Sequence, residues 1–268
     1  MAPREKGDQL GIPNHYGTLR NSYQTFIRRD QDFLTHQVYQ QFFQYLLKQA
    51  VAPSLIRGIM VALDSSFVPT YSSKFEIGSE GWNGFKQAFG FKLHALVDAE
   101  TRFPIALIVT NGLAADGALA ILLLKKAKRY LKKKGYILAD TGFDDTDIVN
   151  WVVKMLRLKA GIPMRKKSQL AKGKKNRYGN LLNWRMKAVC RTFKKSIYKF
   201  RTEVERFFSQ LKHTFFLGKE YARGIEAFTK NVYLALIPFC LTNLWCWNEE
   251  FLIMDQALYI LINEIWLI

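Results

Sequence analysis

The feature that most constrains the fold is a regular alternation of side chains between residues 89 and 97. Apolar side chains occupy every second position, and the intervening positions include polar or small ones: Phe89, Phe91, Leu93, Ala95 and Val97 against Gly90, Lys92 and His94. A period of two residues is that of a β-strand, whose successive side chains point to opposite faces of a sheet. Residues 98–101 then predict a turn, and residues 104–110 predict a returning antiparallel strand.

Further strands are predicted on both sides of this hairpin. The apolar run 59–63 predicts a buried strand that ends in a turn at Asp64, Ser65 and Ser66. Residues 135–139 predict another apolar strand, and a short strand is expected near residues 159–164.

Helices are predicted where apolar residues recur at helical spacing. They are expected within residues 22–50, after Asp116 as a capping residue, after residue 143 with Asp144, Asp145 and Asp147 in the first turn, and at 198–212 and 228–247. The order is therefore three strands, a helix, a strand, a helix, a strand and further helices. This order predicts an α/β fold with a mixed sheet covered by helices.

Positive charge is concentrated in one part of the chain. The 268 residues include 40 Lys and Arg against 22 Asp and Glu, a net charge of +18. Residues 148–202 hold 17 basic residues and no acidic one. Such a segment indicates an anionic polymer as the partner, most often nucleic acid, and the alternative is a solvated loop.

Composition excludes several other classes of protein. The chain is 49% hydrophobic and 14% aromatic, which suits a buried core and not a disordered protein. Cys190, Cys240 and Cys246 form neither a paired framework nor a CxxC motif, which favours a reducing intracellular setting. The first residues lack the apolar core of a signal peptide, and the apolar run 232–247 is short for a membrane span.

Two aspartates follow apolar strands. Asp64 ends Val61-Ala-Leu-Asp64, and Asp140 ends Ile137-Leu-Ala-Asp140. Open α/β sheets place their sites at such strand ends, although a turn or a helix cap explains each aspartate taken alone. His94 and Asp98 could suggest a metal site, but a strand turn with an outward-facing histidine is the favoured interpretation.

A third carboxylate is expected on the helix at residues 198–212. At 100° per residue, a polar stripe of about 60° holds Tyr198, Arg201, Glu205 and Lys212. The apolar face of the same helix holds Val204, Phe207, Phe208 and Leu211. An ordinary i,i+4 pair explains Arg201 with Glu205, but it does not explain why Tyr198 and Lys212 share the stripe.

The spacing Tyr-x2-Arg-x3-Glu-x6-Lys in this stripe resembles the YREK signature of bacterial and archaeal insertion-sequence transposases with a DDE domain. Other segments resemble further motifs of that family in the same order: Val61-Ala-Leu-Asp64-Ser-Ser, Gly90 to Asp98 with Phe103-Pro104, and Leu138-Ala-Asp140-Thr-Gly-Phe-Asp144. The resemblance covers about residues 59–244. It implies a ribonuclease-H-like fold, with a mixed five-stranded sheet flanked by helices and a basic insertion before the helix that carries Glu205.

The resemblance also implies the chemistry. Asp64, Asp140 and Glu205 would be the catalytic residues and the ligands of two Mg²⁺ or Mn²⁺ ions. Two such ions activate an attacking hydroxyl and stabilise the leaving oxygen, so one site could cut the element end and join it to target DNA. The expected partners are double-stranded DNA and a second copy of the chain, at least on DNA, in the prokaryotic cytoplasm near the nucleoid; no membrane partner is expected.

Several side chains are expected to contact DNA. Tyr198, Arg201 and Lys212 would steady phosphates near the cut. The basic insert, residues 165–197, would contact backbone phosphates through Arg165, Lys166, Lys167, Lys172, Lys174, Lys175 and Arg177. Tyr178, Trp184 and Phe193 could stack on unpaired bases, although ordinary packing is favoured for each. A second basic cluster at residues 125–134 is expected to be a solvated helix face.

The resemblance divides the chain into three regions. A helical N-terminal region, 1–57, would recognise element ends, residues 58–248 would form the catalytic domain, and residues 249–268 form an apolar tail that predicts an amphipathic packing helix. The short N-terminal region and the apolar tail also fit a truncated copy. Two alternatives therefore remain: a catalytically inactive, transposase-derived DNA-binding protein, and a related metal-dependent DNA nuclease.

Overall fold

The computed structural model describes residues 37–52, 54–70, 74–164, 193–218 and 223–248. The predicted DNA contacts from Arg165 to Arg177, together with Tyr178, Trp184 and the tail 249–268, lie outside the described residues. The chain divides into two units, residues 1–43 and 44–268, and the fold described below belongs to the second.

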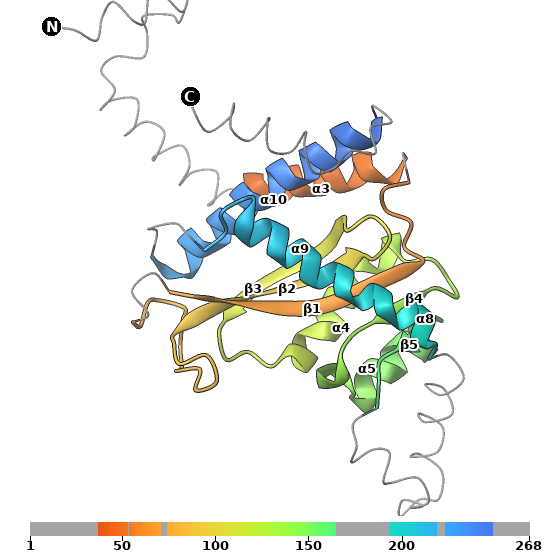
Figure 1. Cartoon of the computed structure of the whole chain (residues 1–268), viewed down its shortest axis with the longest axis horizontal. Helices are drawn as coiled ribbons and strands as arrows, with labels where there is room; N and C mark the ends of the chain where they lie inside the picture. The colour runs from red at the N-terminus through yellow and green to blue at the C-terminus, as the bar shows by residue number, and fades with distance from the viewer. Residues whose placement is uncertain (1–36, 53, 71–73, 165–192, 219–222, 249–268) are drawn as a thin grey trace, which may run out of the picture. The chain divides into compact units, whose positions relative to one another are not determined.

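A mixed five-stranded sheet forms the centre of this unit (Figure 1). Its strands are β1 (Met60–Pro69), β2 (Gly90–Asp98), β3 (Pro104–Asn111), β4 (Tyr136–Leu138) and β5 (Lys159–Gly161). The spatial order is β3-β2-β1-β4-β5; the first three strands pair antiparallel, and β4 and β5 run parallel to β1. The predicted α/β fold with a mixed sheet is confirmed.

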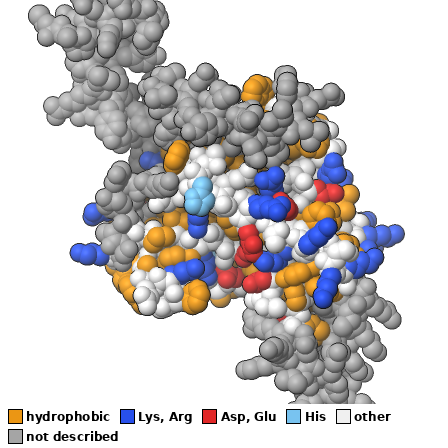
Figure 2. Space-filling model, viewed as in Figure 1, with side chains coloured by type: hydrophobic (Ala, Val, Ile, Leu, Met, Phe, Trp, Pro, Cys, Tyr) orange, Lys and Arg blue, Asp and Glu red, His pale blue; other side chains and the backbone are white. Residues whose placement is uncertain are grey.

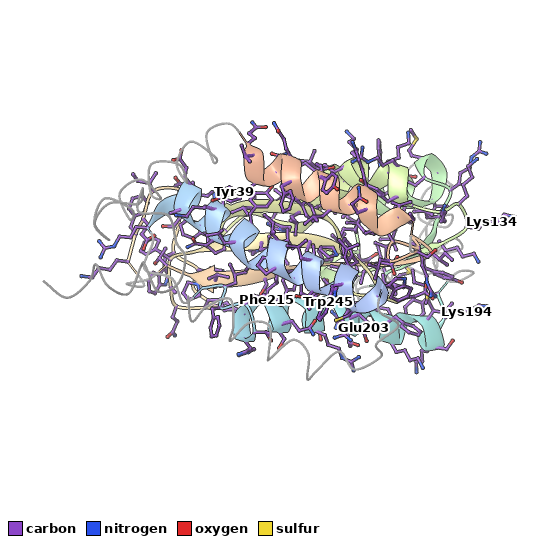
Figure 3. The ribbon with its side chains drawn as sticks, turned by 90° about the horizontal axis from the view of Figure 1, so that it is seen from above. Tyr39, Lys134, Lys194, Glu203, Phe215 and Trp245 are labelled. Carbon is purple, nitrogen blue, oxygen red and sulfur yellow. The ribbon has the colours of Figure 1, made fainter. Side chains whose placement is uncertain are left out.

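Helices cover both faces of the sheet (Figures 1 and 3). One face carries α4 (Asp116–Ala127) and α5 (Thr146–Asn150), which continues into the π-helical turn Trp151–Met155. The other face carries α9 (Thr202–His213), which follows α8 (Lys195–Tyr198) and a 3-10 turn at Lys199–Arg201. The predicted apolar face of α9 is confirmed, because Val204, Phe207, Phe208 and Leu211 are all buried.

Two more helices complete the described chain. They are α3 (Val38–Val51), which lies in the described part of the predicted segment 22–50, and α10 (Gly224–Asn248), which contains the predicted segment 228–247. Within the described residues, none of the helices combines the length and the apolar character that crossing a membrane requires.

Strand β1 is longer than the sequence predicted. It continues through Asp64, Ser65 and Ser66 to Pro69, so the predicted turn is wrong. The physical reason is its pairing with β2, which runs from Val61 opposite Asp98 to Pro69 opposite Gly90 and keeps this segment extended. By contrast, β4 pairs only with residues 60–62 of β1.

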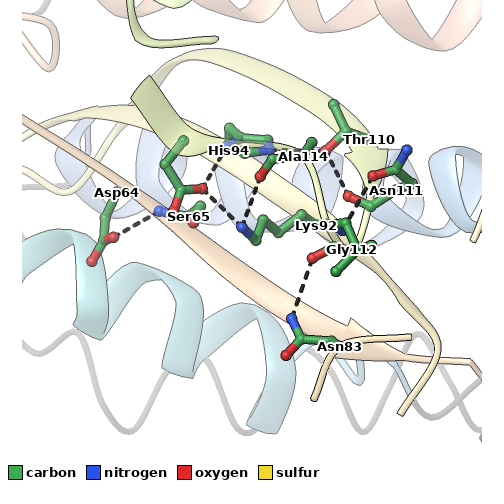
Figure 4. Close-up of polar contacts among 11 residues, drawn as sticks. Asp64, Ser65, Asn83, Lys92, His94, Thr110, Asn111, Gly112 and Ala114 are labelled. Carbon is green, nitrogen blue, oxygen red and sulfur yellow. Dashed lines mark hydrogen bonds and ion pairs between the residues drawn. The ribbon is translucent and has the colours of Figure 1, made fainter. Parts of the chain in front are cut away.

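The prediction of an outward-facing His94 is also wrong, because this side chain is only 1% exposed. Strand β2 lies between β1 and β3 with both faces covered, so both sets of its alternating side chains are buried. His94 Nε2 lies 2.9 Å from Thr110 Oγ1, and Nδ1 lies 3.4 Å from Asp116 Oδ1 (Figure 4). Burial lowers the pKa of His94 to about 4 despite Asp116, so the ring is neutral at pH 7.

Asp116 does not cap α4 as predicted. The N-cap residue is Ala115, which makes no side-chain cap hydrogen bond, and Asp116 Oδ1 instead pairs with Lys92 Nζ at 3.2 Å. At α5 the acidic start is confirmed in part: Asp145 is the N-cap and accepts hydrogen bonds from the backbone N–H groups of Asp147 and Ile148, while Asp144 precedes the cap.

Asp98 has a structural role. Its side chain is fully buried, and its carboxylate accepts hydrogen bonds from the backbone N–H groups of Arg57 and Gly58 at 2.8 Å and Glu100 at 3.0 Å. Burial raises the pKa of Asp98, and these three donors oppose that rise. The carboxylate therefore joins the segment that enters β1 to the turn between β2 and β3.

We expect Asp98→Ala to lower the free energy of unfolding by about 3 kcal/mol, because three backbone donors lose a charged acceptor in a buried place. Urea unfolding followed by circular dichroism measures this loss. Asp147→Ala is the matched control, since Asp147 is exposed and should change stability by only about 0.5 kcal/mol. A loss for Asp98→Ala no larger than that of the control would contradict the assigned role.

Candidate functional site

The parallel pairing of β1 with β4 brings Asp64 and Asp140 to the same place. Ala62 lies opposite Leu138, and each aspartate follows two residues later in its own segment. Positions two residues apart on extended backbone face the same side of a sheet. The two carboxylates therefore leave the same face of neighbouring segments, just beyond the last paired residues.

Backbone donors orient both aspartates. Asp64 Oδ1 accepts a hydrogen bond from the N–H of Ser65 at 2.8 Å (Figure 4). Asp140 has extended backbone at the start of the 3-10 turn Thr141–Phe143, and its Oδ1 accepts a hydrogen bond from the N–H of Gly142 at 2.7 Å. Each carboxylate thus has one oxygen held by backbone close to it in sequence.

Helix α9 and the 3-10 turn before it add the third carboxylate and a cation. Arg201 Nη2 lies 2.6 Å from Glu205 Oε1, which is the predicted i,i+4 pair, and Arg201 Nη1 lies 3.5 Å from Asp64 Oδ2. A single guanidinium therefore bridges the helix and the strand. Figure 2 shows acidic side chains in the middle of this face with Lys and Arg side chains around them.

The charges of Asp140 and Glu205 affect the ionisation of Asp64. Burial raises the pKa of Asp64 to about 6, and the charges of Asp140 and Glu205 add to that rise. The N–H of Ser65 and the charge of Arg201 act in the opposite direction. Negative charge on Asp64 is therefore unfavourable in this site, and a nearby cation stabilises its ionised form.

Tyr198 belongs to the same group. The guanidinium of Arg201 lies 6.0 Å from the centroid of the Tyr198 ring. Burial raises the pKa of the Tyr198 hydroxyl, Arg201 opposes the rise, and Asp140 and Glu205 contribute to it. Three members of the predicted polar stripe, Tyr198, Arg201 and Glu205, are thus gathered with the two aspartates.

Lys212 is not part of this group. Its Nζ donates a hydrogen bond to the carbonyl oxygen of Phe67 on β1 at 2.9 Å. Burial lowers the pKa of Lys212, and the charge of Lys86 adds to that effect. Lys212 lies seven positions after Glu205 on the helix, a rise of about 10 Å. No pattern in the sequence indicates the contacts of Arg201 with Asp64 or of Lys212 with Phe67, because both join distant parts of the chain.

The donor set is chemically suited to a hard divalent cation, because carboxylate oxygens are the ligands that Mg²⁺ and Mn²⁺ prefer. Asp64 and Asp140 are neighbours with one oxygen each held by backbone. Glu205 is engaged by Arg201, and across the described ranges no three or more His, Cys, Asp or Glu side chains form a group that could hold a metal ion. The carboxylate ligands therefore suit Mg²⁺ or Mn²⁺, but the third of them, Glu205, is paired with Arg201 and does not complete a three-ligand group with the two aspartates.

Three lysines around α8 are exposed. Lys194, Lys195 and Lys199 leave the chain around α8, and the rings of Phe193 and Tyr198 are 5.1 Å apart. The cluster at residues 125–134 is a solvated face as predicted, because its Lys and Arg side chains are exposed while Ala127 and Tyr130 are buried.

The raised pKa of Asp64 predicts how stability depends on pH. A carboxyl whose pKa is about 6 in the fold and 3.8 in the unfolded chain is charged at neutral pH at a cost to the folded state, so this cost is absent at low pH, grows between about pH 3.8 and pH 6, and is complete above that range. In EDTA, Asp64→Asn should gain stability over the native chain by up to about 3 kcal/mol between pH 4 and pH 8. Urea unfolding at both pH values checks this, with Asp147→Asn as the exposed control. A gain that is the same at both pH values would contradict the burial argument.

A comparison with known protein families identifies the family of this chain. The family model described as the transposase DDE domain matches residues 58–241, which contain the strands, α9 and all three carboxylates. No curated protein and no solved structure matched the chain. The match covers more than half of the chain, and the mixed sheet with helices on both faces agrees with the ribonuclease-H-like fold expected for the family. The chain therefore belongs to the transposase DDE domain family.

Proposed function

We propose that this transposase cuts the ends of an insertion sequence and joins them to target DNA, with Asp64, Asp140 and Glu205 as its catalytic residues. The observation that carries the proposal is the convergence of these carboxylates from a strand, a strand end and a helix. The contacts of Arg201 with Asp64 and Glu205, and the effect of Asp140 and Glu205 on the pKa of Asp64, support the proposal. Such a concentration of like charge is typical of a site that binds cations.

Mg²⁺ or Mn²⁺, held by these carboxylates as two ions, would supply the charge that activates the attacking hydroxyl and stabilises the leaving oxygen. The chain's own contribution is to present the ligands. Backbone N–H groups orient Asp64 and Asp140, and the apolar face of α9 holds Glu205 beside the sheet.

Arg201 and Tyr198 are proposed to receive the DNA backbone. A guanidinium binds a phosphate in the same forked geometry in which it binds a carboxylate, so a phosphate can replace one of its present partners. Tyr198 lies against Arg201 and limits the positions that the guanidinium can take. The basic insert would continue this contact along the duplex with Arg165, Lys166, Lys167, Lys172, Lys174, Lys175 and Arg177.

The proposed partners follow from the reaction. They are double-stranded DNA, as element end and as target, and a second copy of the chain when two ends are held together. We place this activity in the cytoplasm of a prokaryote, at the nucleoid.

One observation favours a second candidate. Glu205 is bound by Arg201, and the described His, Cys, Asp and Glu side chains form no three-ligand metal group. A transposase-derived protein that binds DNA without cutting it would retain this arrangement. Such a protein would show DNA binding with a steep salt dependence and no metal-dependent cleavage, whereas a related nuclease would cleave and never join.

Substitution of the aspartates tests catalysis. We expect Asp64→Asn and Asp140→Asn to lower Mg²⁺-dependent cleavage and joining by at least about 10³-fold, since each removes a charged ligand. The substrate is duplex DNA from the borders of the genomic element, and products are separated on denaturing gels. Asp147→Asn should keep the native rate. Unchanged cleavage in Asp64→Asn would sink the proposal, and cleavage without joined products in the native chain would identify the nuclease.

A second set of substitutions distinguishes the role of Arg201 from that of Lys212. Arg201→Lys should lower the cleavage rate by about 10-fold or more, because an ammonium cannot contact two groups as a fork does. Lys212→Met should lower the free energy of unfolding by about 1 kcal/mol through the lost bond to Phe67 and leave the salt dependence of DNA binding unchanged. Lys195→Met is the exposed control for stability. A smaller salt slope in Lys212→Met would instead assign Lys212 to a phosphate.

A further inference from the structure

The loop between β1 and β2 exposes an unusual number of large apolar side chains. Phe85 is 89% exposed, Ile77 80%, Phe75 58% and Trp82 50%. Hydrophobic side chains gather with a cation at the lower left of Figure 2, where Figure 1 draws this loop. Exposed apolar surface costs free energy in water, and a contiguous patch of this kind marks a binding surface.

The exposure does not come from a loose backbone. Glu76 Oε2 accepts a hydrogen bond from the N–H of Gly224 at 2.8 Å, and the N–H of Ile225 donates to the carbonyl of Ile77 at 2.8 Å. Asn83 and Ala88 exchange two backbone hydrogen bonds, at 3.0 and 3.4 Å. The loop is therefore anchored to α10 and closed on itself while its apolar side chains remain outside.

The aromatic rings of the loop contact one another and a cation. Phe75 and Trp82 both meet Phe89 edge to face, with centroids 5.9 and 5.3 Å apart and interplanar angles of 89° and 76°. Phe85 is at the tip of the loop, and Lys86 Nζ lies 5.2 Å from the centroid of its ring. Phe75 and Trp82 thus pack against Phe89, and the most exposed ring, that of Phe85, lies beside a cation.

The loop begins at the end of β1 where the helix that carries Glu205 contacts that strand, through Lys212 and Phe67. The charge of Lys86 acts on Lys212, which is on α9 and is bonded to Phe67 of β1. Lys74 and Lys86 are exposed on the loop, whereas of its two acids Glu76 is buried and only Glu80 is exposed. Aromatic rings interleaved with cations suit a nucleic-acid strand whose bases are unpaired, because bases stack on the rings and phosphates meet the cations.

We propose that Phe85 and Trp82, with Lys86, form a stacking site for unpaired bases of the DNA that reaches the catalytic carboxylates. The proposal rests on DNA being the substrate, as stated under the proposed function, and adds that the chain holds part of that DNA single-stranded. A second copy of the chain would also cover an apolar patch, but the exposed cations Lys74 and Lys86 favour a polyanion.

The test measures binding without catalysis. The full chain in EDTA is titrated into fluorescein-labelled oligo(dT), and separately into a blunt duplex of the same length, and anisotropy is recorded. Phe85→Ala and Trp82→Ala should each weaken oligo(dT) binding by about fivefold to 100-fold and duplex binding by less than twofold. Phe85→Trp should bind as the native chain does. Ile77→Ala is the matched control, since it removes an exposed aliphatic side chain from the same loop.

Three results would overturn the proposal. The first is oligo(dT) binding by Phe85→Ala equal to that of Ile77→Ala, and the second is equal weakening on both DNAs. The third is a change in oligomeric state on sedimentation of Phe85→Ala, which would assign the patch to contact between copies. Because the assay needs no metal and no cleavage, it stands apart from the Asp64→Asn experiment: stacking without cleavage contradicts the catalytic proposal alone, and cleavage without stacking contradicts this one alone.

Discussion

The position of β1 in the sheet is the constraint on which the site depends. β1 pairs along its length with β2 and only over residues 60–62 with β4. Asp64 is therefore held in extended backbone by one neighbour and lies beyond the pairing with the other. This combination gives the aspartate a fixed direction while keeping the space beside it open to Asp140.

Helix α9 and the turn before it add Glu205 and Arg201 to the two aspartates of the sheet. Its apolar side chains are buried against the sheet, and Glu205 lies at the border of that face, where Arg201 links it to Asp64. Gathering carboxylates costs free energy through burial and mutual repulsion, as the pKa of Asp64 shows. Arg201 offsets part of this cost by pairing with both Asp64 and Glu205. The same concentration of charge makes the site attractive to divalent cations and to the phosphates that accompany them.

Much of this could be predicted from periodicity and spacing. The two-residue period of residues 89–97 and the order of apolar segments predicted the mixed sheet, and the helical wheel predicted the buried face of α9. The errors have a common cause. Asp64-Ser65-Ser66 has turn chemistry, and His94 occupies a polar position of an alternating strand. Both are overridden because their strands lie inside the sheet, where ladder pairing and coverage of both faces outweigh local preference.

The polar stripe of residues 198–212 likewise shows what the sequence pattern could not predict about the site. Its spacing placed Tyr198, Arg201, Glu205 and Lys212 on one side of a helix, but a helical wheel contains no distance to other elements. The fold brings the first three to the aspartates and fixes the fourth on the Phe67 carbonyl, about two turns away. The exposure of the aromatic side chains in the loop after β1 was likewise not predictable from the sequence, since such side chains could equally have been buried.

The sequence by itself determined the family and the α/β architecture, and it pointed to three candidate carboxylates, because these depend on patterns within short segments and on the order of those segments. The tertiary structure alone decided which cation serves which carboxylate, which histidine is buried and which aromatic rings remain exposed. These depend on contacts between residues far apart in the chain, whose energies come from burial and charge at positions that only the folded sheet and helices define.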